Sequence, residues 1–414
     1  MTEEADVPAG TSPAAPTSSV GPGRTIATAS GALIVGTLPM FLLGALSGRI
    51  GADLEVGGAV IGGLVALFFA AGAASSIPAG HLTDRIGATA ALRTAAVIAA
   101  LCSIGVATFG VEVRVLFVLF LVGGTAIAMA DTGGARAIAS SIPSGRQGIA
   151  FGGKEASIPA ASMLAGFAVP VLGAQLGWRP AFAVAGALAV VFLLAVPRGL
   201  GPTTRTSRRS PTRTQVTSRQ PSTSAAAPGT GIVLLLLAVA AGLGGAASTA
   251  TPTFLVPAAV AGGLAESPAG FLLAGASIVG ICVRLSAGFL ADRMSGAEIR
   301  FTALLMAVGT AGLLALSFGG TVMTLIGAVL AIGGGWGWTG LIFLAAVRTQ
   351  PSRPAGAAGT VLAGLATGGA AGPIAFGWLA DGPGYATAWL TAGTAMFIAC
   401  GIGLLADHRR RRLG

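Results

Sequence analysis

Gly80-His81-Leu82-Thr83-Asp84-Arg85-Ile86-Gly87 is a charged stretch between two long runs that carry almost no charge. The runs on either side, residues 56–78 and 90–110, each reach the roughly 20 apolar residues that a helix needs to cross a bilayer. We therefore expect residues 80–87 to form a loop between two membrane helices. A similar stretch, Gly288-Phe289-Leu290-Ala291-Asp292-Arg293, follows 208 positions later between two further apolar runs.

The composition is that of a membrane protein. Of the 414 residues, 54% are hydrophobic and 9% are charged, and the mean hydropathy is +0.85, which does not suit a soluble surface. The net charge of +10 would suggest nucleic acid in a soluble protein, but most of the surplus arginine lies in alternate loops, so no nucleic-acid partner is expected. The three cysteines lie far apart in separate apolar runs, which predicts no disulfide, metal site or cofactor.

Twelve apolar runs predict the fold class, an all-α membrane protein with twelve transmembrane helices. Each run is expected to be helical, because a backbone polar group in lipid must be paired within its own segment. Gly319-Gly320 predicts a tight hairpin, and Gly364, Gly368 and Gly372, four apart on one face, predict close helix packing. The runs cover approximately residues 26–48, 56–78, 90–110, 115–137, 149–174, 181–197, 231–255, 268–290, 301–319, 321–346, 356–380 and 385–406.

Arginine is distributed unevenly between alternate loops. One set of loops holds only Arg49, Arg114 and Arg179, whereas the other set, which begins with Arg85, holds most of the arginine. The positive-inside rule places the arginine-rich set in the cytoplasm, and an even number of spans then places both termini there. We expect a multi-pass protein of the cell membrane, with a disordered tail at residues 1–25 and a basic tail at residues 407–414.

Residues 198–229 form the one long connection, which is rich in Ser, Thr, Pro and Arg and free of acidic and aromatic residues. They predict a flexible cytoplasmic linker. The linker separates residues 26–197 from residues 230–406, and the two segments correspond: Arg353 follows Arg146 by 207 positions, close to the offset of 208 between the charged stretches. We expect two pseudo-symmetric six-helix bundles with a substrate site between them near the midplane.

The Gly-x-Leu-x-Asp-Arg stretch after the second run, repeated after the eighth, resembles the signature loop of the major facilitator superfamily of secondary transporters. The resemblance implies that Asp84 caps the N-terminus of the eleventh helix, where the helix dipole favours an anion, and that it pairs with Arg136. A merely solvated turn is the alternative. Arg284 is expected to brace the second turn rather than to bind substrate. The remaining residues of this gating motif are Gly80, Arg85, Gly87, Gly288, Asp292 and Arg293.

A second resemblance covers the fourth and fifth runs. Arg146-Gln147-Gly148-Ile149-Ala150-Phe151-Gly152-Gly153-Lys154, followed by Ile158-Pro159, Gly166, Pro170 and Gly177-Trp178-Arg179, looks like the corresponding region of actinobacterial and cyanate-permease-like facilitators. There the lysine is usually followed by glutamine, whereas Glu155 follows it here. Residues 148–154 also fit the start of a phosphate-binding loop, but Glu155 replaces the required Ser or Thr, so no ATPase is expected.

Three charged residues are expected to lie inside the membrane on one helical hairpin. Lys154, the only lysine, and Glu155 lie about five residues, or roughly 8 Å, inside the fifth helix, and Asp131 lies at comparable depth in the fourth. Charge at this depth is unfavourable unless it is paired or faces water. We predict that Lys154 faces the cavity and pairs with Asp131 or a substrate carboxylate, with purely structural pairing as an equal alternative. Asp131 or Glu155 is the expected proton carrier.

Aromatic residues near helix breaks are candidates for substrate contact. Phe41 follows Pro39 in the first run and Phe254 follows Pro252 in the seventh, and these two helices line the cavity in the family that the chain resembles. Trp336 and Trp338 lie mid-helix in the tenth run, where they either contact a hydrophobic ligand or fill space left by glycines. We favour packing.

These features predict a secondary transporter that moves a small organic solute, such as an anion, with proton coupling. It is expected to work by alternating access as a monomer, without covalent chemistry, and so not as an enzyme. Its partners would be the substrate, protons and membrane lipids. The alternative is a drug or metabolite efflux proton antiporter, which Ser157-Ile158-Pro159-Ala160 weakens because the Gly-Pro motif of drug antiporters is not clean there.

Overall fold

The computed structural model describes residues 20–142, 147–200, 229–293, 296–350 and 354–412. Within these ranges every regular element is a helix. In the described part of the chain, eleven helical segments are long and apolar enough to cross a membrane. The apolar helix α9 (Arg179–Ala195) has 17 residues, the lower limit for a span, and supplies the twelfth. The predicted all-α membrane fold is confirmed.

The helices before the long connection form the N-terminal half. The first four spans are α1 (Pro22–Ala45), α3 (Gly58–Ile86), α4 (Ala88–Phe109) and α5 (Val113–Ser141), with the short α2 (Ser47–Leu54) after α1. The fifth span is built from α6 (Gln147–Glu155), α7 (Ser157–Ala168), the π-helical η2 (Val169–Gly173) and α8 (Ala174–Leu176), and α9 is the sixth.

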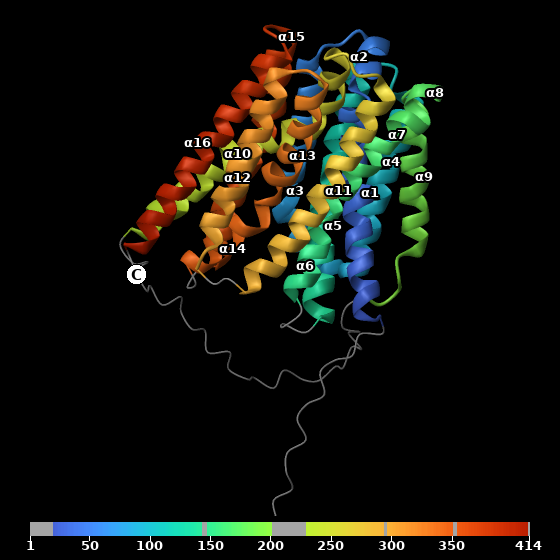
Figure 1. Ribbon diagram of the computed structural model, residues 1–414. Coiled ribbons are helices and arrows are strands. Elements are labelled where there is room, and N and C mark those ends of the chain that lie inside the picture. The colour runs from blue at the N-terminus through green and yellow to red at the C-terminus, as the bar shows by residue number, and fades with distance from the viewer. Residues whose placement is uncertain (1–19, 143–146, 201–228, 294–295, 351–353, 413–414) are drawn as a thin grey trace, which may run out of the picture.

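The helices after the connection form the C-terminal half, which lies on the left in Figure 1. They are α10 (Thr230–Ala261), α11 (Glu266–Arg293), α12 (Glu298–Phe318), α13 (Thr321–Gly337) continued by α14 (Thr339–Thr349), α15 (Pro354–Asp381) and α16 (Tyr385–Arg411). The lower side of the molecule in Figure 1 carries α6, α14 and the end of α16. We call this the arginine-rich side, defined by Arg85, Arg136, Arg300, Arg348 and Arg410. The other side is called the opposite side.

The charged stretch that separates the second and third spans is helical over most of its length. Helix α3 continues to Ile86, and α4 begins at Ala88. Only Gly87 leaves the helix, with φ 84°, a conformation that glycine adopts without steric penalty. The expected loop over residues 80–87 is therefore wrong in extent, and Asp84 lies in the last turn of a membrane helix.

The fifth and tenth spans are interrupted, where the sequence predicted continuous helices. Pro159 has no N–H, so it cannot bond to the carbonyl of Glu155 four residues earlier, and the span breaks at Ala156. The tenth span breaks at Trp338, after a glycine-rich segment. The predicted hairpin at Gly319 and Gly320 is present, with φ 69° and 75°.

Glycines decide how closely the helices of the C-terminal half approach. A Cβ at Gly364, Gly368 or Gly372 of α15 would collide with the backbone of α10. The predicted glycine seam is therefore confirmed, because only a residue without a side chain lets the two backbones come this near.

The two halves also meet through glycines. A Cβ at Gly62 of α3 would collide with the carbonyl of Pro373 of α15, and one at Gly166 of α7 would lie 2.7 Å from the carbonyl oxygen of Gly270 of α11. Ser277 of α11 donates to Ser162 of α7 at 3.0 Å. These contacts hold the two halves together in the part of the molecule nearer the opposite side.

Candidate functional site

Lys154 is the buried centre of a charged cluster. Its side chain is 3% exposed, and its ammonium group pairs with Asp131 of α5 and with the adjacent Glu155, whose Oε1 lies 3.0 Å away. Its Nζ also lies 5.9 Å from the centre of the Phe151 ring. The pairing expected with Asp131 is present. The break at Ala156 ends α6 directly after Glu155, and both carboxylates reach the same ammonium group.

The acids of this cluster are accessible, whereas the cation is not. The side chain of Asp131 is 53% exposed and that of Glu155 is 39% exposed. A proton or a small cation can therefore reach either carboxylate, whereas the ammonium group of Lys154 is shielded by its two partners. Within the described ranges no group of three or more His, Cys, Asp or Glu residues could hold a metal ion.

Arg284 connects this cluster to the C-terminal half. Its buried guanidinium donates to the carbonyl of Glu155 at 2.8 Å and to the carbonyl of Trp336 at 3.1 Å. Both carbonyls lie at helix breaks, one in each half, where the interrupted helix leaves them without a regular partner. A single guanidinium has the several donors in a fixed geometry that this bridge requires.

This bridge gives Arg284 a role beyond the one expected from the sequence. The guanidinium stacks on the Trp336 ring, 5.2 Å from its centre, and Glu155 Oε2 lies 4.0 Å away. Its partners among the described residues are thus in α6 and α13. We expected Arg284 to brace the second charged stretch, and that contact stays a prediction because the stretch lies largely outside the described side chains. Among the described residues, Arg284 bridges the two halves.

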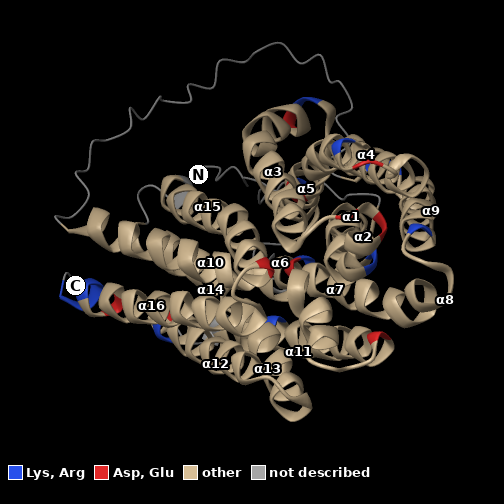
Figure 2. Cartoon of the chain, turned by 90° about the horizontal axis from the view of Figure 1, so that it is seen from above, with Lys and Arg blue, Asp and Glu red and all other residues tan. Residues whose placement is uncertain are grey.

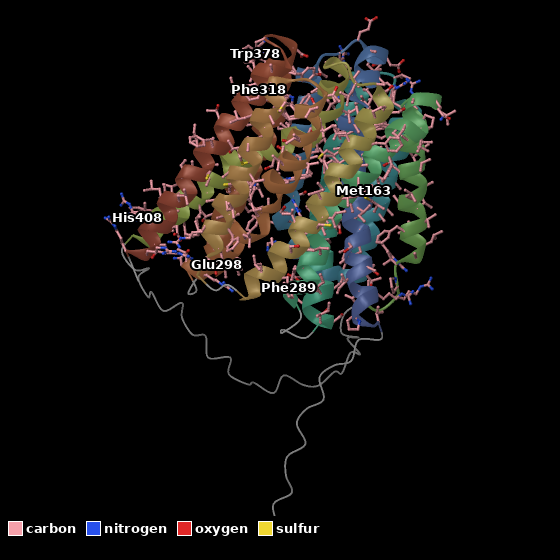
Figure 3. The ribbon with its side chains drawn as sticks, viewed as in Figure 1. Met163, Phe289, Glu298, Phe318, Trp378 and His408 are labelled. Atoms are coloured by element: carbon pink, nitrogen blue, oxygen red, sulfur yellow. The ribbon has the colours of Figure 1, made fainter. Side chains whose placement is uncertain are left out.

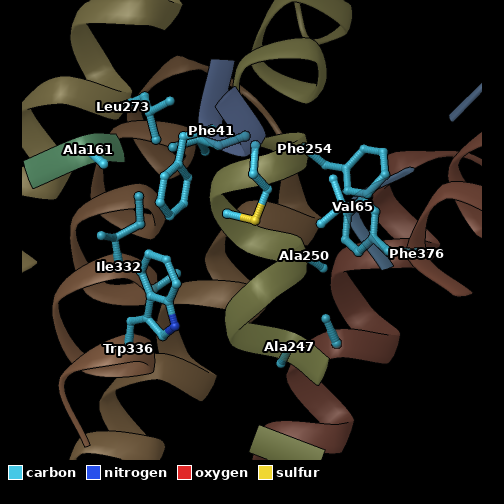
Figure 4. Close-up of a cluster of buried hydrophobic side chains, with 14 of the residues drawn as sticks. Phe41, Val65, Ala161, Ala247, Ala250, Phe254, Leu273, Ile332, Trp336 and Phe376 are labelled. Carbon is cyan, nitrogen blue, oxygen red and sulfur yellow. The ribbon is translucent and has the colours of Figure 1, made fainter. Parts of the chain in front are cut away.

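Three of the four aromatic candidates, Phe41, Phe254 and Trp336, are seen in Figure 4 among buried hydrophobic side chains. Phe41 meets Trp336 edge-to-face with 5.6 Å between ring centres, next to Arg284. Phe254 stacks on Phe376 of its own half at 4.7 Å. Trp338 is fully buried in the C-terminal half and donates to the carbonyl of Gly335 at 2.8 Å. All four side chains are buried in the hydrophobic core, and Trp336 is the one that also contacts the charged cluster, through Arg284.

The gating motif lies apart, on the arginine-rich side. Asp84 pairs with Arg136 of the same half, and its side chain is 71% exposed. The start of the eleventh helix lies outside the described side chains, so the cap that the resemblance implied stays a prediction. Gly80 lies against the methyl group of Thr132, and Arg85 is exposed. The surroundings of Gly288 and the side chains of Asp292 and Arg293 lie outside the described part of the structure.

A helix cap between the halves exists on the opposite side, which the sequence analysis missed. Asp381, at the end of α15, accepts hydrogen bonds from the backbone N–H groups of Gly58 at 2.7 Å and Ala59 at 2.8 Å, at the start of α3. The sequence held one usable signal for Asp381, because charged residues are few in the loops of that side and each is therefore a candidate for a specific contact. Two of these, Arg49 and Glu266, form an ion pair between the halves. The hydrogen bonds from Arg49 to Glu266 raise the pKa of the guanidinium, so it stays charged.

The comparisons with known proteins agree with this architecture. Residues 22–349 match the family model described as Major Facilitator Superfamily. No curated protein matches the chain. Among solved structures, the chain is similar to a bacterial homologue of the human lysosomal transporter Spinster in an inward-facing, unoccupied conformation. The TM-score is 0.68 at 14% identity, covering 95% of this chain and 96% of that chain. An inward-facing, occupied structure with the same description gives a TM-score of 0.65 at 14% identity, covering 94% and 96%.

Proposed function

The chain belongs to the major facilitator superfamily, a family of secondary transporters, and we propose that it moves a small organic anion together with protons across the cell membrane. The family and the fold indicate a multi-pass membrane transporter rather than an enzyme. Within the family, the stretch from Arg146 to Lys154 favours a place near the cyanate-permease-like members. We further propose that the transporter is a monomer with both termini in the cytoplasm.

The observation that carries this proposal is the buried Lys154 held between two accessible carboxylates. Protonation of Asp131 or Glu155 removes one of the two negative charges that neutralise the ammonium group. A buried cation with an incomplete set of partners is unfavourable, so the protonated state favours an incoming anion. Proton binding and anion binding would thereby stabilise each other, which is the thermodynamic requirement for coupled transport.

The contacts between the halves support alternating access. The described contacts at Gly62, Asp381 and Arg49 close the opposite side, whereas Asp84 on the arginine-rich side remains exposed. Such an arrangement is expected when the cavity opens toward the arginine-rich side, which loop charge places in the cytoplasm. The similarity to a transporter in its inward-facing conformation favours the same state.

The test is flux in proteoliposomes with an imposed pH gradient. A screen of organic anions should identify one whose uptake follows the gradient, and Asp131→Asn or Glu155→Gln should abolish the dependence of that uptake on pH. Asp53→Asn is the matched control, because Asp53 is a half-exposed acid that pairs with Arg179 away from the cluster. Unchanged pH dependence in both cluster variants would show that the coupling is wrong.

An efflux antiporter is the second candidate, and the contact of Phe41 with Trp336 beside the cluster favours it. An apolar aromatic pair next to exposed acids suits a hydrophobic substrate with a cationic group. The uptake and efflux proposals predict different phenotypes for cells that lack the gene. Sensitivity to hydrophobic cations would support efflux, whereas failure to grow on an organic acid would support uptake.

A further inference from the structure

A groove of about 610 Å³ lies on the flank of the C-terminal half, apart from the charged cluster. Its walls are apolar and come from α11 and α12, with α14 as the floor; they include Cys282, Leu285, Phe289, Phe301, Leu304 and Leu341. Figure 3 shows Phe289 and Glu298, which also lines the groove, near the lower ends of these two helices. The volume lies within the roughly 300–1,000 Å³ that is usual for ligand pockets.

The groove faces outward from the bundle. Leu285, Phe289 and Leu304 are 46%, 50% and 56% exposed. Helix α12 packs against α13, α14 and α16 of its own half, and it lies at the margin of the molecule when the bundle is seen from above (Figure 2). In a membrane, such a surface is in contact with lipid chains.

Positive charge gathers where the groove reaches the arginine-rich side. The buried Glu298 lines the groove and is shared by Arg348 and by Arg410, the latter at 3.4 Å. Asp407 behind it binds Arg300 at 3.0 Å and Arg411 at 2.8 Å. Among the described side chains of these ion pairs, two carboxylates face four guanidinium groups, which leaves a surplus of two positive charges.

Arg348 is the guanidinium best placed to meet a ligand in the groove. It follows Leu341, the floor of the groove, by seven residues, or two helical turns, and so lies on the same face of α14. Its side chain is 35% exposed even though it pairs with Glu298. A guanidinium in this position can bind a phosphate oxygen while it keeps its carboxylate partner.

The length of the groove fits one membrane leaflet. From Phe289 to Cys282 the wall on α11 rises about 10 Å, or two thirds of the roughly 15 Å that one leaflet of hydrocarbon occupies. We propose that the groove binds an anionic phospholipid, with one acyl chain between α11 and α12 and its phosphate at Arg348. The charge surplus selects the anionic headgroup, and the apolar walls hold the chain. This proposal does not depend on the transported substrate.

Cys282 offers a direct test, because it is the exposed cysteine of the groove whereas Cys102 and Cys400 are buried. The full chain is purified in detergent, and the rate of maleimide labelling is measured with added dioleoyl phosphatidylglycerol, dioleoyl phosphatidylcholine or glycerol phosphate. We expect the anionic lipid to slow labelling several-fold at a concentration where the zwitterionic lipid has little effect. Equal protection by both lipids would overturn the headgroup selectivity, and protection by glycerol phosphate would identify a site for free anions instead.

Two variants locate the lipid. Leu304→Trp should fill the groove and reduce the phosphatidylglycerol retained in native mass spectrometry, whereas Leu404→Trp, on an equally exposed leucine of α16, should not. Arg348→Gln should raise the lipid concentration for half protection about fivefold, since one arginine near a membrane surface contributes about that factor. Arg409→Gln removes an exposed arginine outside the groove as its control. The proposal would be overturned if Leu304→Trp or Arg348→Gln had no larger effect than its control. Thermal unfolding midpoints of the variants verify that each protein is folded.

Discussion

The two ends of the interface between the halves are built differently. On the opposite side, backbone meets backbone at Gly62 and Pro373, and Asp381 caps the first turn of α3. On the arginine-rich side, Asp84 and Arg136 form an exposed pair within one half. Exposed pairs contribute only about 0–1 kcal/mol. The opposite side thus depends on close backbone packing, whereas the charges of the arginine-rich side can exchange partners at little cost in free energy.

Arg284 lies between these two ends and belongs to neither. It is buried, and it hydrogen-bonds both halves at once. A bridge of this kind must break or slide when the halves rotate. We therefore expect substitutions here to have larger effects than substitutions at either end.

The largest effect is expected for Arg284→Gln. Glutamine cannot reach both carbonyls, and each unpaired buried carbonyl costs about 1–3 kcal/mol. Flux in proteoliposomes should fall at least about tenfold, since 1.4 kcal/mol already corresponds to that factor. Arg284→Lys should not restore it, because a single ammonium group lacks the planar geometry of the guanidinium. Normal flux in Arg284→Lys would show that charge alone matters, and Arg179→Gln serves as the control at an exposed guanidinium.

Gly62→Ala tests the backbone contact of the closed end. The added methyl group meets the carbonyl of Pro373, and overpacking of this kind costs about 1–3 kcal/mol. The equilibrium between the two conformations should shift about 5–150-fold toward the state with this end open, which lowers flux. Gly63→Ala is the matched control, because a Cβ there makes ordinary contact with Phe117 at 3.8 Å. Equal flux in the two variants would contradict the importance of this contact.

Asp381→Asn weakens the cap between the halves. An anion at a helix N-terminus contributes about 0.3–1 kcal/mol when exposed, and salt reduces the effect. We expect a decrease in flux of a few-fold that diminishes at high ionic strength. Asp53→Asn, which affects a hydrogen bond from Trp178 within the same half, should leave the conformational equilibrium unchanged.

The smallest effect is expected for Asp84→Asn. The pair with Arg136 is exposed and contributes little in the state with the arginine-rich side open. Flux should nevertheless fall without loss of membrane insertion, because we expect the carboxylate to cap the eleventh helix once that side closes. Flux equal to that of the unmodified protein would contradict this latch and would leave Asp84 as a solvated turn residue.

The sequence predicted the twelve spans and one of their close contacts. Apolar length decides what crosses a bilayer, and the spacing of Gly364, Gly368 and Gly372 was sufficient to predict where α15 meets another helix. The pair of Lys154 with Asp131 was predicted for the same local reason, since both residues lie at one depth on neighbouring helices.

Other parts of the site could not be predicted from local pattern. Phe254 and Phe41 follow prolines in equivalent spans, yet Phe254 stacks on Phe376 of its own half while Phe41 meets Trp336 across the interface. The sequence contains no signal for this difference, because it depends on how each helix is rotated. The cap by Asp381 was missed for a similar reason, since its partner is the backbone of a helix more than 300 residues away.

The length of each apolar run and the placement of arginine in alternate loops are local properties of the chain, and they act through the bilayer without any tertiary contact. The sequence by itself therefore determined the transmembrane helices and their arrangement in two similar halves. The tertiary structure decided which charges meet. Arg284 reaches Glu155 and Trp336 because the packing of the two halves brings two interrupted helices within reach of one guanidinium.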